Sequence, residues 1–227
     1  MKIMAEKVHE ALLQRKSVRA YLDKHVSNET IVRILTSAAQ SPSGNNIQPW
    51  CVNVLTGAAL KRLSSAIIYC YENSGAPSPE YDYYPTSWPE PHLSRRRQNG
   101  WALYEIIGIN RGDVEGVKSH HKRNYSFFGA PIGLIFSVDR RLGDGAYIDI
   151  GLFMQALSTA AVAEGLATCM QAIFAPYHSL IREQLDLDHN QKVICGMSLG
   201  YEDTSAIINS LQTPRVPVSE FARFHEL

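Results

Sequence analysis

The sequence has 227 residues, of which 45% are hydrophobic and 19% are charged, and its 22 Lys and Arg residues balance 22 Asp and Glu residues. The balanced charge argues against a dedicated nucleic-acid-binding protein, which usually has a marked basic excess. No apolar run approaches the roughly 20 residues needed to cross a bilayer, so no membrane partner is expected. Residues 1–10 lack the apolar core and cleavage site of a secretory signal peptide.

The cysteines and the overall composition limit how the chain can be organised into domains. The four cysteines lie far apart and none forms a Cys-x-x-Cys motif, so we expect reduced thiols and no disulfide framework. We therefore expect a cytoplasmic protein. A chain of this length can bury a substantial core, and it shows no internal repeat and no break in composition. We expect a single domain over residues 1–227.

The first predicted helix covers about residues 3–14, where apolar residues recur at helical spacing, and a basic run, R-K-S-V-R, follows at residues 15–19. In an extended segment alternate side chains point the same way, so Arg15, Ser17 and Arg19 can converge. Guanidinium groups beside a hydroxyl form a grip for a phosphate or a carboxylate. A solvated basic turn is the alternative interpretation.

A second helix is predicted to begin at Ser27 or Asn28, either of which can cap it. Apolar residues then recur at helical spacing over residues 31–39, which gives the helix one apolar face. The helix must end by Ser41, because Pro42 pushes the residue before it toward extended geometry.

The loop at residues 41–50, S-P-S-G-N-N-I-Q-P-W, is unusually dense in amide side chains. Gly44 allows a turn or a close approach of the backbone to another group. Asn45, Asn46 and Gln48 each offer hydrogen-bond donors and acceptors. With the aromatic residue that ends the loop, they suit a planar ligand that forms hydrogen bonds. A well-capped connection between a helix and a strand is the alternative.

The remaining periodic segments predict a chain that mixes helices and strands. We expect strands at residues 50–55, 131–138, 166–170 and 192–201, and helices at residues 58–69, 101–107, 113–128, 145–165 and 177–185. The helix at residues 145–165 is apolar all round, so it must be buried on all sides, as a central core helix or as a dimer seam.

Residues 73–91 form an aromatic and proline-rich insert, with five prolines, three tyrosines and a tryptophan. Linkers are poor in aromatic residues, so we expect a packed segment. Long irregular loops inside a compact domain are usually functional or disordered. The insert is therefore either a lid or wall of a pocket, or an aromatic-rich surface loop that packs against the rest of the protein.

Several motifs that would define other chemistries are absent from the sequence. It has no dinucleotide-binding G-x-G-x-x-G, no P-loop, no H-E-x-x-H and no G-x-S-x-G. The adjacent His120 and His121 fall on different faces of a helix, so no metal site is expected. The basic run at residues 95–97 is interpreted as a solvated helix face, or as a surface that attracts an anionic nicotinamide cofactor or an aromatic carboxylate.

The basic run and the loop together resemble the signature of the FMN-dependent nitroreductase family, R-x-S-x-R/K followed by P-S-x-x-N-x-Q-P-W. The segment G-L-A-T at residues 165–168 is similar to the family's strand before a flavin-facing loop, and Arg215 is similar to its terminal basic residue. The insert, the triple arginine and the F-A-R-F segment at residues 221–224 resemble the nitrobenzoate-reductase-like members most.

The resemblance implies a fold and a set of ligand contacts. The fold would be α+β, with a central, mostly antiparallel sheet flanked by helices, in an intertwined homodimer that holds FMN at its interface. The chemistry would be carried by FMN, with no catalytic side chain. The implied FMN-binding residues are Arg15, Lys16, Ser17, Arg19, Pro42, Ser43, Gly44, Asn46, Gln48, Gln171, Ala172, Ile173 and Arg215.

Within that set the resemblance implies separate roles. Arg15, Ser17 and Arg215 would bind the phosphate, and Arg19 would stabilise the reduced flavin near N1 and O2. Ala172 or Ile173 would donate a main-chain N–H to N5. The loop residues 42–48 would come from the partner subunit. The family often has a second basic residue where this chain has Thr213, which predicts a phosphate site with one charge fewer.

The implied activity is an NAD(P)H oxidoreductase with ping-pong kinetics, in which the electron donor and the oxidant alternate on the flavin. The oxidant would be a nitroaromatic, a quinone or a similar conjugated acceptor, and a nitrobenzoate is the most specific expectation. Dehalogenation and flavin cleavage are alternatives within the same fold. A flavin-binding regulatory or storage protein without turnover is the alternative from another class.

Overall fold

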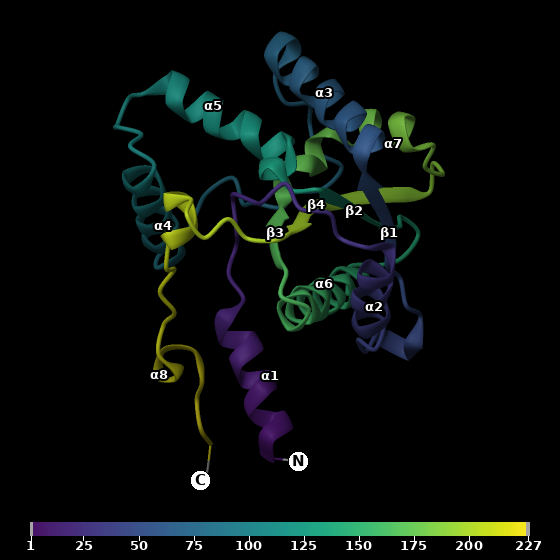
Figure 1. Cartoon of the computed structure of the whole chain (residues 1–227), viewed down its shortest axis with the longest axis vertical. Helices are drawn as coiled ribbons and strands as arrows, with labels where there is room; N and C mark the ends of the chain where they lie inside the picture. Colours follow the sequence, from purple (N-terminus) through teal and green to yellow (C-terminus); the bar gives the residue numbers. More distant parts are fainter. Residues whose placement is uncertain (1, 226–227) are drawn as a thin grey trace.

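The fold is built around a four-stranded sheet with the strand order β1-β2-β4-β3 (Figure 1). This computed structural model describes residues 2–225, with side chains from residue 7 onward. The strands are β1 (Cys51–Thr56), β2 (Ile132–Asp139), β3 (Ala167–Gln171) and β4 (Gln191–Gly200). All three pairings are antiparallel, which confirms the α+β class with an antiparallel sheet.

Helices fill most of the remaining chain, and in the described residues seven of the eight α-helices overlap a segment that the apolar periodicity predicts. They are α1 (Lys2–Gln14), α2 (Asn28–Ala38), α3 (Gly57–Ser74), α4 (His92–Ile106), α5 (Val114–Tyr125), α6 (Gly145–Ala163), α7 (His178–Leu185) and α8 (Val218–Phe221), with the short 3-10 helices η1 (Gly44–Asn46), η2 (Phe127–Gly129), η3 (Ala172–Tyr177) and η4 (Ile207–Ser210). Ser27 caps α2 by accepting from the backbone N–H of Thr30, as predicted.

Two helices are longer than the sequence pattern predicts. Helix α3 continues to Ser74, and α4 begins at His92 and includes the triple arginine. The first half of α4 has no repeating apolar residue, so periodicity could not reveal it. Arginine and glutamine nevertheless have high intrinsic helix propensity, which is sufficient on an exposed element.

The sheet carries a core on each face, because its two central strands are buried on both sides. Along β2, Leu134 and Phe136 belong to the cluster under α2 and α6, whereas Ile135 belongs to the cluster under α3 and α7. The period of two in a strand directs alternate side chains to opposite faces. Both faces are apolar, so β2 has a continuous apolar sequence rather than an alternating one.

Helix α6 lies across one face of the sheet and contacts α1 and α2. Among the described residues it is the one helix long and apolar enough to cross a membrane, with 19 residues and a hydropathy of 1.4. The expectation that no apolar run comes near that length is therefore corrected. Phe153 and Leu157 of α6 are core residues. Ile148, however, is 69% exposed, so a single chain does not bury α6 on all sides, which excludes the first of the two predicted alternatives, a central core helix, and leaves the dimer seam as a prediction.

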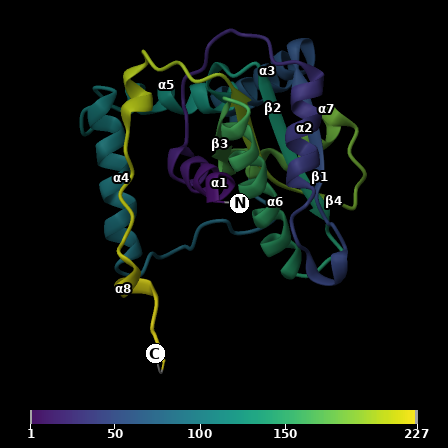
Figure 2. The ribbon, with the colours of Figure 1, turned by 60° about the horizontal axis from the view of Figure 1, so that its bottom comes forward.

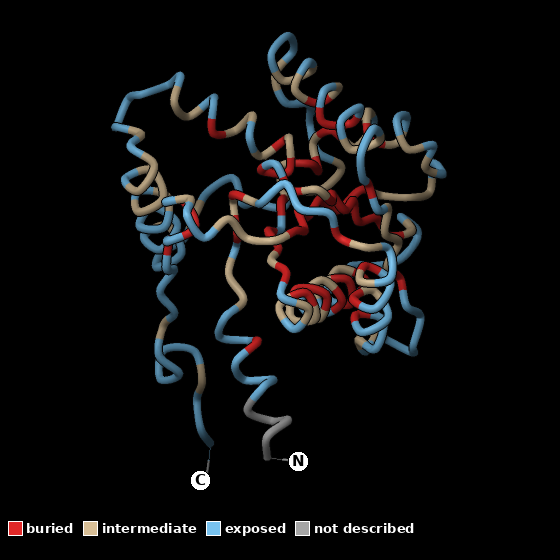
Figure 3. Tube along the Cα trace, viewed as in Figure 1, coloured by how far each residue is buried: buried red, intermediate tan, exposed pale blue. Residues whose placement is uncertain are grey.

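The two ends of the chain extend away from the compact body: Figure 1 shows this for α1, and Figures 1 and 2 show it for the segment that carries α8. Figure 3 places the buried residues mainly on the sheet and its flanking helices, whereas α8 is exposed. Several apolar side chains of these ends are exposed, including Leu13 of α1 and both Phe221 and Phe224 near the C-terminus. The ends therefore present apolar surface that a single chain does not cover.

Candidate functional site

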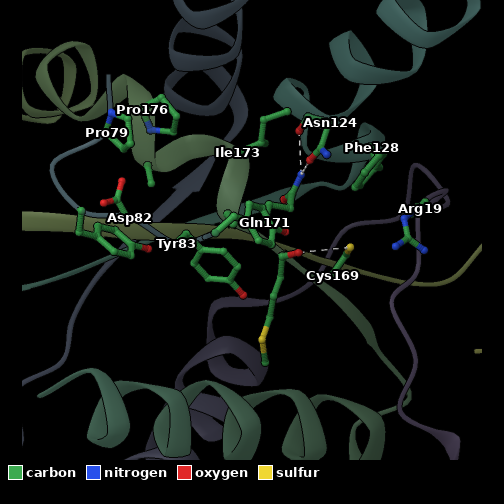
Figure 4. A pocket seen from close by; sticks show the side chains of 15 residues that line it. Arg19, Pro79, Asp82, Tyr83, Asn124, Phe128, Cys169, Gln171, Ile173 and Pro176 are labelled. Atoms are coloured by element: carbon green, nitrogen blue, oxygen red, sulfur yellow. Dashed lines mark hydrogen bonds between the residues drawn. The ribbon is translucent and has the colours of Figure 1, made fainter. Parts of the chain in front are cut away.

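A cleft of about 530 Å³ lies between the end of β3 and the insert (Figure 4). Its volume falls in the range of about 300–1,000 Å³ that is usual for small-molecule sites. The body contributes Arg19, Asn124, Phe128, Cys169, Met170, Gln171, Ala172, Ile173, Ala175 and Pro176. The insert contributes Pro79, Tyr81, Asp82, Tyr83 and Tyr84, so the insert lines the cleft as one of its walls.

The body wall is formed where β3 passes into η3. Ala172 and Ile173 open η3, so their N–H groups have no acceptor within that helix. Gln171, the last residue of β3, is 2% exposed. These three predicted FMN-binding residues lie together in the cleft.

Gln171 is held by Asn124, a residue that the sequence pattern did not single out. The Gln171 side-chain amide donates to the main-chain oxygen of Asn124 at 2.7 Å and to its Oδ1 at 2.6 Å. Because the Oδ1 of Asn124 faces Gln171, the Nδ2 of Asn124 points away from Gln171 and can donate to another group. The Oε1 of Gln171 is buried without a hydrogen-bond partner among the described residues. Such an unpaired buried acceptor is costly, and a bound donor would relieve that cost.

The segment at residues 15–19 lies beside β3, a neighbour that the sequence did not predict. Ser17 forms an isolated parallel bridge with Thr168, and the Val18 N–H donates to the Thr168 oxygen at 3.0 Å. The backbone of Arg19 is fixed by Asn209, whose Oδ1 accepts from the Arg19 N–H at 2.8 Å. This places the Arg19 side chain at the cleft in Figure 4.

Asn209 is a second residue that the sequence pattern missed. It is buried in η4, and its amide donates to the main-chain oxygens of Ala20 at 2.8 Å and Asp203 at 2.9 Å. Both of its amide ends are therefore used to hold the chain that follows Arg19. A single asparagine in an irregular segment carries no sequence signal for such a role.

A second cavity, of about 640 Å³, lies between the end of α1 and the C-terminal segment. It is lined by Leu12, Leu13, Gln14, Arg15, Lys16, Glu202, Leu211, Gln212, Thr213 and Arg215. Burial, followed by the charge of Arg215, lowers the pKa of Arg15. Two guanidinium groups held close together repel each other, and an anion between them would stabilise both. The predicted phosphate residues Arg15 and Arg215 are thus brought to one cavity.

Lys16 is already engaged by the protein itself. Its ammonium lies 2.7 Å from the Glu202 carboxylate and donates to the main-chain oxygen of Asn209 at 2.8 Å. These contacts tie the basic run to the segment around η4. Lys16, one of the predicted FMN-binding residues, therefore has its ammonium group paired within the protein.

The loop at residues 42–48 does not reach either cavity within one chain. Gly44 lies instead in a separate hollow beside α6, where its N–H contacts both carboxylate oxygens of Asp149 at 3.3 Å. The Ser43 Oγ accepts from the Gln48 N–H at 2.9 Å. The predicted FMN-binding residues of this loop therefore lie near one another but apart from Arg19 and Gln171. They are Pro42, Ser43, Gly44, Asn46 and Gln48.

The same loop carries backbone strain. Asn45, Asn46 and Gln48 have φ angles of 49°, 57° and 49°, in the left-handed region that non-glycine residues rarely adopt. Strain of this kind costs about 1–3 kcal/mol per residue and is concentrated at functional sites. An ordinary connection between a helix and a strand does not require three non-glycine residues with positive φ, so the strain favours a binding role for the loop.

Comparison with known proteins gives the family. The model of the Nitroreductase family matches residues 12–201, which is most of the chain. The chain is 39% identical over 213 residues to a 4-nitrobenzoate reductase of Nocardioides sp. (strain LMS-CY), covering 92% of this chain and 86% of that protein. It is 38% identical to a chloronitrobenzene nitroreductase of Comamonas testosteroni, covering 96% of this chain and 97% of that protein. The chain belongs to the nitroreductase family.

Solved structures agree with this assignment. The FMN and NADPH-dependent nitroreductase NfnB from sphigopyxis sp. strain HMH superposes with a TM-score of 0.93 at 35% identity, covering 97% of this chain and 99% of that one. The FMN-dependent NfnB from Mycobacterium smegmatis, in complex with NADPH, gives a TM-score of 0.94 at 29% identity, covering 98% and 100%. The family expected from the two sequence motifs is confirmed.

Proposed function

We propose that this chain is an FMN-dependent NAD(P)H oxidoreductase that reduces nitroaromatic compounds. The observation that carries the proposal is the arrangement of the two cavities on either side of residues 15–19. One cavity presents Arg15 and Arg215, and the other presents Gln171, Ala172 and Ile173. Four steps of extended chain span about 13 Å, so this segment can follow an elongated ligand from an anionic end to a planar end.

The residues present fit FMN. Arg15, Ser17 and Arg215 would bind its phosphate, while Lys16 holds the segment in place through Glu202. Arg19 would place its positive charge beside the flavin ring at the cleft. FMN, when bound, supplies the hydride and electron transfer, so the protein needs no catalytic acid of its own.

The polar edge of the flavin would meet the amide pair on the body wall. The Oε1 of Gln171 needs a donor, and Ala172 and Ile173 offer main-chain N–H groups near it. Asn124 lies beside them and is the residue that we assign to the contact with N3 and O4, for which the sequence alone gave no candidate.

We further propose a homodimer in which the partner subunit supplies the loop at residues 42–48. Three observations support it: the loop is strained, it lies apart from the cleft of its own chain, and α6 leaves Ile148 and Leu152 exposed. The extended ends of the chain add further uncovered apolar surface, including Leu13. A second copy would cover these surfaces and bring Asn46 and Gln48 to the flavin.

The acceptor that we propose is a nitroaromatic compound, with a nitrobenzoate as the most specific choice. Two relatives are named 4-nitrobenzoate reductase, at 39% and 36% identity, and another is named nitrobenzene nitroreductase. The exposed rings of Tyr83 and Tyr84 offer an aromatic wall against which a flat acceptor can stack. The four cysteines are free thiols, which fits the reducing cytoplasm where NAD(P)H is available.

The test is a visible spectrum of the purified protein before and after NADPH or NADH is added without oxygen. We expect a flavin spectrum that bleaches with the reductant and returns when 4-nitrobenzoate is added. A bound flavin that neither nucleotide reduces would indicate a storage or regulatory protein. A reduced flavin that returns with a halogenated compound, but not with a nitroaromatic or a quinone, would indicate dehalogenation. A protein that takes up no FMN would contradict the whole assignment.

A further inference from the structure

The insert is attached to the body through the carboxylate of Glu80 and through the neighbouring Tyr81. Glu80 Oε1 accepts from Arg140 Nη2 at 2.9 Å and from Arg182 Nη2 at 3.2 Å. The Nδ1 of His178 lies 3.6 Å from its Oε2. We call Glu80, Arg140, Arg182 and His178 the carboxylate clasp. Arg140 lies in the turn after β2, whereas Arg182 and His178 belong to α7, so the clasp joins three separate parts of the chain.

The clasp is more enclosed than the ordinary surface ion pairs of this protein. The Glu80 side chain is 13% exposed, compared with 47% for Glu72, which pairs with Lys122 at 2.6 Å on the surface. Burial opposes the charge on Glu80, but the hydrogen bond from Arg140 and the charges of His178, Arg140 and Arg182 outweigh it, so the pKa of Glu80 is lowered. An enclosed, multiply bonded carboxylate of this kind holds its segment more firmly than an exposed pair.

Tyr81, the residue after Glu80, is part of the wall of the cleft. Tyr81 donates its hydroxyl to the main-chain oxygen of Ile194 at 2.5 Å and stacks on Tyr147 of α6, with ring centroids 5.6 Å apart. Ring contacts then continue along the insert, from Tyr81 to Tyr83 at 6.4 Å and from Tyr83 to Tyr84 at 4.7 Å. Figure 4 shows Tyr83 facing the cleft from the side opposite Asn124.

Glu80 does not itself line the cleft, although its neighbours Pro79 and Tyr81 do. The carboxylate points into the body while the residues on either side of it face the ligand space. Tyr83 and Tyr84 are more than half exposed, so little besides the clasp and the ring contacts fixes their positions. The place of the aromatic wall therefore depends on a residue outside the cleft.

We propose that Glu80 is a positioning residue, whose clasp with Arg140 and Arg182 holds Tyr83 and Tyr84 where a flat aromatic acceptor stacks. The inference rests on the proposed function and deepens it, because it assigns the selectivity for aromatic acceptors to a residue that touches no ligand. Breaking the clasp loosens the wall, weakens binding of aromatic acceptors and leaves the flavin and its reduction unchanged.

The experiment compares Glu80→Gln with the matched control Glu72→Gln in the FMN-loaded enzyme. Steady-state kinetics are measured with 4-nitrobenzoate and with ferricyanide, which has no aromatic ring. For Glu80→Gln we expect the KM for 4-nitrobenzoate to rise about tenfold with kcat nearly unchanged. This is the pattern of a substitution that weakens binding of the substrate and of the transition state equally. Ferricyanide kinetics, FMN content and the rate of flavin reduction by NADPH should match the wild type, and Glu72→Gln should match it throughout.

A second variant tests the same contact from the side of Arg140. If Glu80→Gln does not fold, Arg140→Gln breaks the clasp from its more exposed side, at 35% exposure, and should show the same split between the acceptors. Equal losses with both acceptors, or an unchanged KM for 4-nitrobenzoate in an active enzyme, would reduce the clasp to a structural role. A wild-type enzyme that reduces neither acceptor with NADPH would instead contradict the proposed function, and this inference with it.

Discussion

The two walls of the cleft are built in different ways. The body wall is part of the sheet: Gln171 is paired with Gly196 in the β3–β4 ladder and is bonded twice to Asn124. The insert wall at residues 75–91 has no helix or strand and is attached mainly through Glu80 and Tyr81. The sheet fixes the positions of the residues in the body wall. The residues of a loop held by a few side-chain contacts can move without unfolding the protein.

This difference assigns separate tasks to the two walls. A cofactor that stays bound through many turnovers is best held by the rigid wall, and an acceptor that enters and leaves is best matched by the adjustable one. Substitutions in the body wall should therefore reduce stability and FMN binding, whereas changes in the insert should alter the use of acceptors.

The largest effect is expected from Gly196→Val in β4, on the body wall. A Cβ at this position would lie 2.4 Å from the Phe174 ring, which is fully buried in η3 and cannot move aside. Overpacking of this kind costs about 3 kcal/mol. We expect a lower melting temperature and loss of FMN, measured by thermal unfolding and flavin absorbance.

The control for that substitution is Gly100→Ala in α4, where an added Cβ meets open space. Alanine should leave the protein unchanged or stabilise it by about 0.5–1 kcal/mol, because glycine weakens a helix interior. If Gly196→Val retains wild-type FMN content and melting temperature, the body wall is less rigid than the packing indicates.

Next in size is the loss of a phosphate contact in Arg15→Ala or Arg215→Ala. A charged hydrogen bond contributes about 2 kcal/mol, which corresponds to roughly 30-fold weaker FMN binding. Equilibrium titration of the apoprotein with FMN measures the change. Arg33→Ala is the matched control, because Arg33 forms an exposed ion pair with Glu164 and lines neither of the two cavities. Unchanged FMN affinity in both variants would contradict the phosphate assignment.

A smaller effect on FMN, but a clear one on the acceptor, is expected from deleting residues 76–89. The deletion removes Glu80 and the whole tyrosine wall while the body wall and the basic run remain. We expect FMN to stay bound and the preference for 4-nitrobenzoate over ferricyanide to fall by about tenfold. Identical preferences before and after the deletion would mean that the insert serves packing alone.

The smallest effect is the pH dependence of the clasp. The folded-state pKa of Glu80 is lowered, so its contribution to stability is present above the ordinary glutamate pKa of about 4.3 and is lost as the pH falls through the folded-state value. The difference in melting temperature between wild type and Glu80→Gln should therefore shrink as the pH is lowered from pH 7 to about pH 3. The same comparison with Glu72→Gln should show little difference at either pH. A constant difference would show that the Glu80 carboxylate does not stabilise the fold through its charge.

The regular elements were largely predictable because their signals are local. The apolar period of α2 and the capping hydroxyl of Ser27 lie within one short stretch of sequence. The length of α4 was not predictable from periodicity, since its first half has no apolar face to repeat. The burial of α6 was predicted for all sides, but in one chain Ile148 remains exposed, because composition does not say which neighbour covers which face.

Local sequence patterns were sufficient to predict the family and to locate the basic run at residues 15–19, the amide-rich loop at residues 41–50 and the aromatic insert. Each of these rests on residue types at short, fixed spacing, where proline, glycine and backbone period act directly. Only the tertiary structure decided which distant side chains meet, such as Arg19 with Asn209, 190 residues apart, and Glu80 with Arg182, 102 residues apart. Such contacts depend on how the sheet and helices pack around a shared core, and no local pattern in the chain encodes them.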